Sequence, residues 1–460
     1  MAPIFVARQW ALLAMSVGVF CIQLDAFALN LALPQIGRDL HADSGGLQWV
    51  VSAYLLSTGT LMLGAGRLGD LFGRRRLLVL GLALFGVSSL VCALAPTLPV
   101  LIGARVAQGA GAAMIMPVGL SLLTNLYPSK LRGRAIGWAL GIGGIATACG
   151  PFVGGFLTDT LSWRAVFWLN VPLAAAGALA ARRVDENFDN NHHRQIDWLG
   201  LATITAALAA LAIVVDRVKT WPLSASTAGI ILVFALLILF VYREQQTTSP
   251  LVDLALFRNG PFMALTLTGA AANAAVVMFL FVVPLMLQGQ WNLSVVRAGV
   301  AFFVPALAMA LTGPLAGRIV PATAIHAMIL FLAGAAACLL CLVWAPSLTV
   351  YLTAATLAGA TLGAANALSL TATQGVITPE RAGEASGVTK TVITVAAGLS
   401  VAMAGAVTDG NRGIGSQAAS ETALQITAIN CLAAALVLSL WTLGMHARRR
   451  RSISPAERAC

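Results

Sequence analysis

Two charged residues lie inside long apolar stretches of the sequence, where charge is costly. Asp25 falls in the stretch 24–34 and Arg105 in the stretch 101–113. A guanidinium that deep in lipid needs a cavity or an acidic partner, and we expect Asp25 to be that partner. A buried carboxyl beside a cation is under opposing influences on its proton affinity, which suits a proton carrier. The alternatives are a static pair, or an Arg105 side chain that reaches the membrane surface.

Arg105 shares a helical face with Gln108, Gly109 and Ala112, which follow it by three, four and seven residues. Small residues on that face allow another helix to approach closely. We therefore expect Gln108 to line the same interior region as Arg105.

The segment 66–76 combines glycine, one carboxylate and four arginines. Gly66 and Gly73 bracket an expected tight turn between two helices, with Asp70, Arg74 and Arg75 beside it. Such a charge cluster can hold one conformation together and break in another, so we predict a gating role. The simpler alternative is a positively charged anchor, which would need only the arginines.

Glycine and proline are concentrated in 150–155, where Gly150 and Gly154 form a small-residue face and Gly155 follows. Pro151 removes a backbone donor and kinks a helix. We predict a closely packed hinge, and simple packing is the alternative.

These residues lie in a chain whose composition indicates membrane helices. It is 59% hydrophobic and 10% charged over 460 residues, against roughly 25% charged in globular domains. The apolar stretches lack the alternation of barrel strands, so we predict an all-α membrane protein with 14 transmembrane helices. The stretches lie near 10–33, 47–66, 77–95, 98–125, 134–157, 163–181, 197–215, 225–242, 262–288, 297–318, 324–344, 349–374, 384–408 and 422–444.

Most of the 28 basic residues fall in loops that share one side if the N-terminus is cytoplasmic. Cytoplasmic loops are enriched in Lys and Arg, so we expect both termini inside. A short repeat relates 128–137 to 379–387, and Gly66-Arg67 to Gly317-Arg318. We predict an N-terminal six-helix half at 1–183, a linker with two inserted helices at 184–259, and a C-terminal six-helix half with a basic tail at 260–460.

A central cavity would draw polar and aromatic side chains from several spans. The expected members are Gln23, Asn30, Trp49, Tyr54, Gln108, Asn273, Gln288, Asn366 and Gln374. Few charges among them favour an amphipathic substrate, although Trp49 could instead be an interfacial anchor. We expect no metal and no cofactor, because Cys338 and Cys341 lack a second ligand pair. The dispersed basic residues argue against a nucleic-acid partner.

Several of these motifs resemble the major facilitator superfamily, and specifically its fourteen-span drug:proton antiporters. The segment 66–76 is similar to the signature between spans two and three, 101–113 to the span-four motif, and 146–155 to the antiporter motif. Segments 24–34, 163–172 and 284–288 are similar as well. The resemblance implies a fold of two six-helix halves plus a two-helix insert.

The resemblance implies export by alternating access, with Asp25 and Arg105 coupling proton entry to the exit of a hydrophobic or amphipathic drug or antibiotic. We expect a multi-pass monomer in the bacterial inner membrane. A dedicated exporter of one endogenous compound, an uptake symporter, and a membrane enzyme or sensor are the alternatives. The sequence departs from the family at 317–318, where the charged loop is reduced. Glu384, Lys390 and Asp409 are the charged candidates in the second half.

Overall fold

The computed structural model describes residues 2–42, 44–185, 197–217, 221–247, 251, 254–316, 319, 321–377, 382–409 and 416–452. These residues form fifteen helices and no strand. The helices are α1(Ala2–Asp39), α2(Ser44–Phe72), α3(Arg74–Ala93), α4(Leu98–Leu126), α5(Ser129–Thr160), α6(Arg164–Arg182), α7(Trp198–Arg217), α8(Leu223–Gln246), α9(Ala255–Arg258), α10(Gly260–Gly289), α11(Val295–Ala316), α12(Pro321–Val343), α13(Leu348–Gly375), α14(Ala382–Asp409) and α15(Ser416–Ser452).

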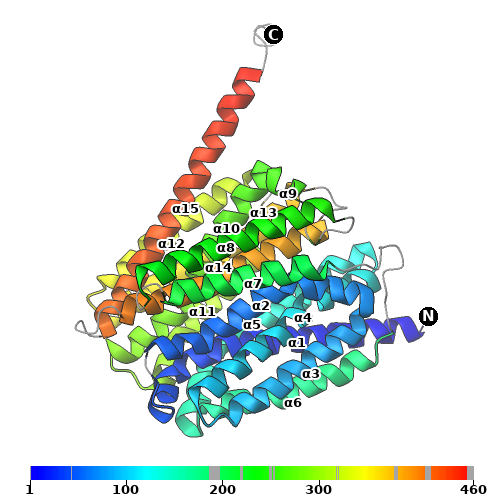
Figure 1. The fold of residues 1–460 in the computed structure, drawn as a ribbon. Helices are drawn as coiled ribbons and strands as arrows, with labels where there is room; N and C mark the ends of the chain where they lie inside the picture. Colours follow the sequence, from blue (N-terminus) through cyan, green and yellow to red (C-terminus); the bar gives the residue numbers. More distant parts are fainter. Residues whose placement is uncertain are drawn as a thin grey trace.

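The long helices run roughly alongside one another in one elongated bundle, and the end of α15 projects beyond it (Figure 1). Eleven helices in the described part of the chain are long and apolar enough to cross a membrane. The bent helix α5 makes a twelfth if its two segments form one span. The chain is thus a multi-pass membrane protein, while the predicted fourteen spans would also require α2 and α14 to cross.

Helices α10–α15 pair with one another in the order in which α1–α6 pair. Within the first group α1 packs on α5, α2 on α4, and α3 on both α4 and α6. Within the second group α10 packs on α14, α11 on α13, and α12 on both α13 and α15. The groups meet where α2 packs on α14 and where α5 packs on α11. This order matches the sequence repeat, and the domain boundaries at 183 and 259 remain predictions.

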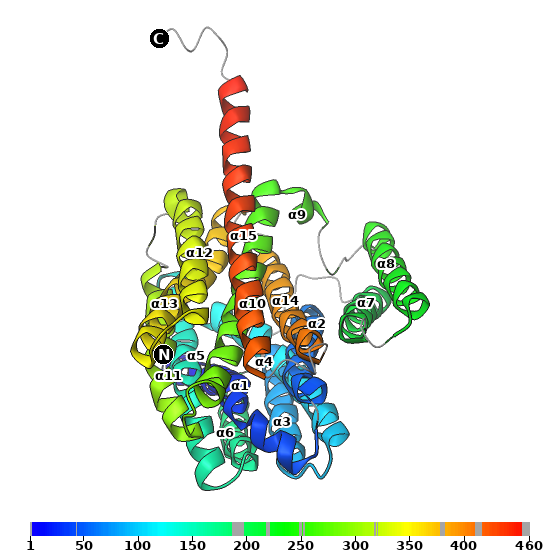
Figure 2. The ribbon, with the colours of Figure 1, turned by 90° about the vertical axis from the view of Figure 1, so that its left-hand side faces the viewer.

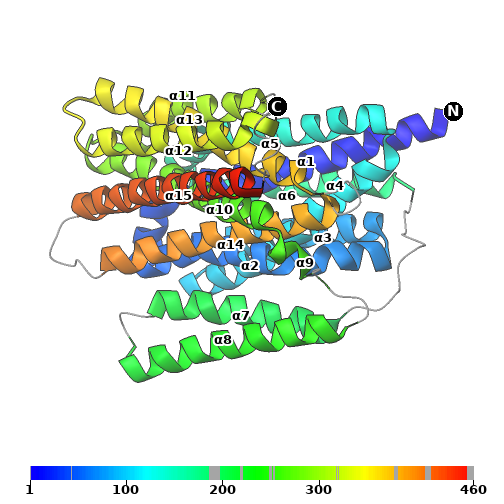
Figure 3. The same cartoon turned by 90° about the horizontal axis from the view of Figure 1, so that it is seen from above.

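Helices α7 and α8 form an antiparallel pair at one edge of the bundle (Figures 2 and 3). Helix α7 lies against both α2 and α14, the two helices that form one of the seams between the groups. Leu208 of α7 packs there beside Leu56 of α2 and Val395 of α14. The outer face of α8 leaves large apolar side chains such as Ile231 and Ile238 exposed, as expected of a surface that faces lipid.

Helix α5 is bent by 43° between its segments Gly141–Thr147 and Cys149–Thr160. Pro151 lies four residues after Thr147, so it has no N–H to donate to the Thr147 carbonyl and its ring crowds that carbonyl. The predicted kink is therefore present, one turn before the proline. Its role as a hinge stays a prediction.

Candidate functional site

The core of the site is an ion pair between Asp25 of α1 and Arg105 of α4. Arg105 Nη1 donates to Asp25 Oδ2, and both side chains are 0% exposed. Arg105 Nε donates to the carbonyl oxygen of Val50 on α2 at 2.8 Å. The carboxylate and guanidinium therefore tie three helices together, and neither charge is left alone in the low-dielectric interior.

Two amide side chains complete the set of donors to the Asp25 carboxylate. Gln108 Nε2 and Asn170 Nδ2 donate to Asp25 Oδ1 at 3.0 and 2.8 Å. The same Gln108 nitrogen donates to Ser89 Oγ at 2.8 Å, and Gln108 Oε1 accepts from Arg105 Nη1 at 2.6 Å. Because side chains of α1, α3, α4 and α6 converge here, the charge state of Asp25 is linked to the packing of four helices.

Two aromatic rings flank the Arg105 guanidinium. The Arg105 Cζ atom lies 4.2 Å from the ring centroid of Tyr54 on α2 and 5.9 Å from that of Phe167 on α6. A cation over an aromatic face is stabilised by about 0.5–2 kcal/mol. The rings also keep water from the pair, which strengthens its electrostatic attraction.

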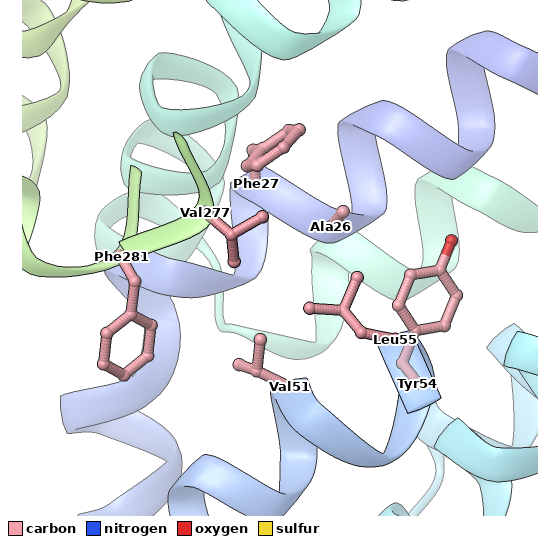
Figure 4. A pocket seen from close by; sticks show the side chains of 7 residues that line it. All are labelled: Ala26, Phe27, Val51, Tyr54, Leu55, Val277 and Phe281. Carbon is pink, nitrogen blue, oxygen red and sulfur yellow. The ribbon is translucent and has the colours of Figure 1, made fainter. Parts of the chain in front are cut away.

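A small cavity lies next to this network, between α1, α2 and α10 (Figure 4). Its lining residues are Ala26, Phe27, Val51, Tyr54, Leu55, Val277 and Phe281. Ala26 follows Asp25 in the chain, and the Tyr54 ring separates the cavity from Arg105. The cavity thus joins both groups of helices beside the buried carboxylate. Its side chains are apolar except for the Tyr54 hydroxyl, which donates to the carbonyl oxygen of Ile22 at 3.4 Å.

The structure distributes the other predicted cavity residues over several places. Gln23 donates to Thr147 Oγ1 of α5 at 3.0 Å, and Asn273 of α10 donates to the carbonyl oxygen of Ile393 on α14 at 2.9 Å. Gln288 donates within its own helix to the Pro284 carbonyl at 3.3 Å.

Trp49 packs at the seam between α2, α7 and α14, near Leu56 and Val395. Asn366 lies partly buried on α13. Gln108 belongs to the ion-pair network, so among the members of the predicted set whose side chains are described, Tyr54 alone lines the cavity. The side chains of Asn30 and Gln374 lie outside the part of the structure that is described.

The segment 66–76 forms the end of α2 and the start of α3. Gly66 lies inside α2, which continues to Phe72, so the turn is made by Gly73 alone. Gly73 has φ 103°, which only glycine adopts without strain. Arg74 is buried, and Arg75 Nη1 donates to the carbonyl oxygen of Val184 at 3.3 Å. The side chain of Asp70 lies outside the described residues, so its gating role remains a prediction.

Three glycines of α5 make close contacts with neighbouring helices. A Cβ on Gly154 would overlap the backbone of Ala28 on α1, and one on Gly150 would lie 3.0 Å from Phe27 Cβ. A Cβ on Gly155 would lie 2.9 Å from the carbonyl oxygen of Val295 on α11. Gly150, Pro151, Gly154 and Gly155 therefore place α5 between α1 and the second group of helices.

Two members of the network are absent from the predicted site residues: Ser89 and Asn170. Asn170 lies in the apolar stretch of α6 and is fully buried. An amide inside a membrane span usually bonds to another helix, so its position alone was a signal. Ser89 gave no such signal, because a serine commonly donates to its own helix, as Ser89 does to the Phe85 carbonyl at 2.7 Å.

Groups of three or more potential metal ligands are absent from the described residues. The arrangement is a buried carboxylate–guanidinium pair held by amide side chains, with a small apolar cavity beside it. No nucleophile with an adjacent base is placed at the cavity among the residues described here.

Three relatives show what the chain is similar to. The drug efflux pump JefA of Mycobacterium tuberculosis is 35% identical over 318 residues, which cover 68% of this chain and 62% of that protein. The multidrug resistance protein Stp of the same species is 34% identical over 315 residues, covering 67% and 58%. The riboflavin transporter RibZ of Clostridioides difficile is 30% identical over 314 residues, covering 68% of each chain.

The matched region spans about three fifths of the length of the two mycobacterial relatives. The family model described as Major Facilitator Superfamily matches residues 15–401, which include the Asp25–Arg105 network, the bent helix α5 and most of α14. The chain belongs to the major facilitator superfamily.

Proposed function

We propose that the chain is a fourteen-span, proton-coupled antiporter that exports hydrophobic or amphipathic compounds across a bacterial inner membrane, with both termini in the cytoplasm and as a monomer. Relatives named as a drug efflux pump, a multidrug resistance protein and a tetracenomycin C export protein support export. The observation that carries the proposal is the buried Asp25 carboxylate, which lies beside an apolar cavity between the two groups of helices.

Protonation of Asp25 changes this network because both carboxylate oxygens already accept hydrogen bonds. Asp25 Oδ1 accepts from Gln108 and Asn170, and Oδ2 accepts from Arg105. A proton added to either oxygen displaces one of these donors and removes the charge that attracts Arg105. Uptake of a proton thus loosens the contacts between α1, α4 and α6.

The cavity links this change to the substrate. Ala26, which follows Asp25 in the chain, and Tyr54, which lies over Arg105, both line the cavity, so a substrate that widens this small cavity displaces residues next to the ion pair. Substrate and proton then favour different arrangements of the two groups, which is what antiport requires. The bend before Pro151 and the contacts of Gly155 with α11 let α5 transmit the movement.

The test uses purified protein in liposomes with an acidic interior, and measures uptake of N-phenyl-1-naphthylamine, a neutral amphipathic fluorophore. We expect the pH gradient to drive uptake by the wild type. The Asp25→Asn variant should fall to the level of protein-free liposomes, because its side chain cannot carry a proton. The matched control is Asp39→Asn, since Asp39 lies on the same helix, accepts from Trp163 Nε1 at 2.9 Å, and is 41% exposed.

We expect Asp39→Asn to retain most of the gradient-driven uptake. If Asp25→Asn transports the fluorophore with wild-type dependence on the gradient, the assignment of Asp25 is wrong. If the wild type responds to no gradient, proton coupling itself is wrong.

Uptake is the second candidate, and the similarity to a riboflavin transporter favours it. Riboflavin added outside right-side-out vesicles would accumulate in the presence of the protein if this candidate were correct. Export predicts accumulation in everted vesicles instead.

A further inference from the structure

Lys390 lies on α14, whose own acidic residues, Glu384 and Asp409, stand near its two ends. Residues 260–377, which supply α10 to α13, contain no Asp or Glu. Lys390 is partly buried, and within the described residues it makes no hydrogen bond and no ion pair. An ammonium in a membrane bundle without a counter-charge is costly, and such residues commonly mark a path for substrate or ions.

Neighbouring helices contact α14 on three sides, and Lys390 lies on the fourth. Toward α2, Val395 lies against Gly59 and Gly398 against Leu56. Toward α10, Thr389 bonds to Thr266 and the carbonyl of Ile393 accepts from Asn273. Toward α7, Leu399 packs near Leu208. These three directions occupy the two sides and the back of the helix.

Lys390 shares the remaining face with Ala397 and Val401, which follow it by seven and eleven residues, or two and three turns. Ala397 and Val401 are buried in the core cluster that also contains Phe27 of α1 and Phe279 of α10. The face of α14 that carries Lys390 therefore looks into the region between the two groups of helices.

Asn366 of α13 lies at a depth in the bundle similar to that of Lys390. It lies nine residues before the end of α13, and Lys390 lies eight residues after the start of α14. Both are thus about 12–14 Å from the same end of the bundle. On α13, Ser369 approaches Gly269 of α10 and Gly363 approaches Met309 of α11. Asn366 projects between these two directions, toward the same central region as Lys390.

The Asn366 side chain makes no hydrogen bond in the described part of the chain: its buried Oδ1 is an unpaired acceptor, and its Nδ2 group is the donor available to a ligand. An amide donor and an ammonium on neighbouring helices form a pair suited to a carboxylate, which accepts several hydrogen bonds. An anion here would supply the negative counter-charge that Lys390 lacks among the described residues, whereas a neutral or cationic compound would not.

We propose that Lys390 and Asn366 recognise an anionic group, so that the substrates of this chain are amphipathic compounds carrying a carboxylate. The proposal rests on the proposed transport function. The carboxylate is held at Lys390, and the apolar body extends along the central region toward the cavity beside Asp25. Eight residues, or about 12 Å of helix, separate Lys390 from Gly398, which packs against Leu56, the chain neighbour of the cavity residue Leu55.

The experiment compares 1-pyrenebutyrate with its methyl ester, two probes that share an apolar body and differ in charge. Binding to the full-length protein in detergent is followed by energy transfer from tryptophan to pyrene. We expect Lys390→Met to weaken binding of the carboxylate by about tenfold or more, equivalent to about 1.4 kcal/mol, and to leave binding of the ester within about twofold. Asn366→Leu should give a smaller loss in the same direction.

Two control variants isolate the role of Lys390. Lys390→Arg keeps the charge and should keep the preference for the carboxylate. Arg297→Met removes one positive charge from an exposed position at the start of α11 and should change neither affinity. Equal binding of acid and ester by the wild type, or unchanged acid binding by Lys390→Met, overturns the proposal.

Transport of the two probes into acidic liposomes separates this proposal from the proposed function. Wild-type protein that binds the carboxylate through Lys390 but moves neither probe under a pH gradient would contradict the transport mechanism and support the anion site. Gradient-driven movement of both probes at rates unaffected by Lys390→Met would contradict the anion site and support the transport mechanism.

Discussion

Helices α1–α6 and α10–α15 pack in the same order, but the two groups differ in whether their buried charged residues have partners. The first group encloses Asp25 and Arg105 as a fully buried pair with two amide partners. The second group holds Lys390 without an acid on α10 to α13. In one group the charges are neutralised inside the protein, and in the other a charge faces the central region.

The difference shows that the helix arrangement and the polar chemistry are set by separate features. Close approach in both groups depends on small residues, as at Gly154 against Ala28 and at Gly363 against Met309. Those contacts position helices whatever polar residues they carry. We propose that one scaffold thus accommodates a proton site in one group and a substrate-recognition site in the other.

The largest expected difference in stability is between removing the paired charge of Arg105 and removing the charge of Lys390. Arg105→Gln leaves the Asp25 carboxylate buried without its cation, so we expect a loss of about 3–5 kcal/mol in unfolding free energy and no coupled transport. Lys390→Met removes a charge that has no partner in the described residues, so its stability should be equal to or above that of the wild type. Unfolding in detergent against a denaturant measures both.

The double variant Asp25→Asn/Arg105→Gln is the control for the stranded charge. It should recover part of the stability that Arg105→Gln loses, because no unpaired carboxylate remains. If the double variant is no more stable than Arg105→Gln, the ion pair is not what stabilises the packing of α1 against α4.

A smaller effect distinguishes the buried amides of the two groups. Asn170→Leu removes a donor to the Asp25 carboxylate, and a hydrogen bond to a charged group contributes about 1.5–3 kcal/mol. We expect gradient-driven transport to fall by about tenfold or more, with a shifted pH profile. Asn273→Leu removes a bond to a neutral carbonyl of Ile393 and should cost about 1 kcal/mol of stability, with an unchanged pH profile. Similar pH profiles for both variants would contradict the special role of Asn170.

The smallest expected effect concerns α7 and α8, which have no counterpart in either group. Asp197 directly precedes α7 and accepts from the Gly200 N–H and from the Thr247 hydroxyl, both at 2.9 Å. Burial raises the pKa of Asp197, but these bonds and the nearby Arg243 guanidinium outweigh it and hold the pKa below its usual value. At pH values above the unfolded-state pKa of roughly 3.9, Asp197→Ala should lower the free energy of unfolding by about 1 kcal/mol.

Because the folded-state pKa is lowered, this stabilisation is present at neutral pH and is lost as the pH falls through that value. The difference in melting temperature between wild type and Asp197→Ala should be constant from about pH 5 to pH 8 and shrink below about pH 4. Asp159→Ala, at an exposed position on α5, should show no such trend. A difference that grows toward low pH would contradict the assignment.

Local features of the sequence predicted much of the site. The apolar runs predicted the long helices, since a backbone in lipid must satisfy its own hydrogen bonds. The depth of Asp25 and Arg105 in such runs predicted their pairing, because neither charge is tolerable alone. The bend in α5 followed from the missing N–H of Pro151. The expected turn between Gly66 and Gly73 was less accurate, because α2 continues to Phe72.

Sequence by itself therefore determined where helices form, which charges must find partners, and where the chain bends, because these depend on neighbours along the chain. Only the tertiary structure decided that Asn170 and Ser89 reach the network, that Trp49 packs at a seam beside α7, and that Ala397 and Val401, on the helical face of Lys390, are buried in the core. These outcomes depend on how helices distant in the chain rotate and pack against one another, and the residue types along a single helix do not specify that rotation.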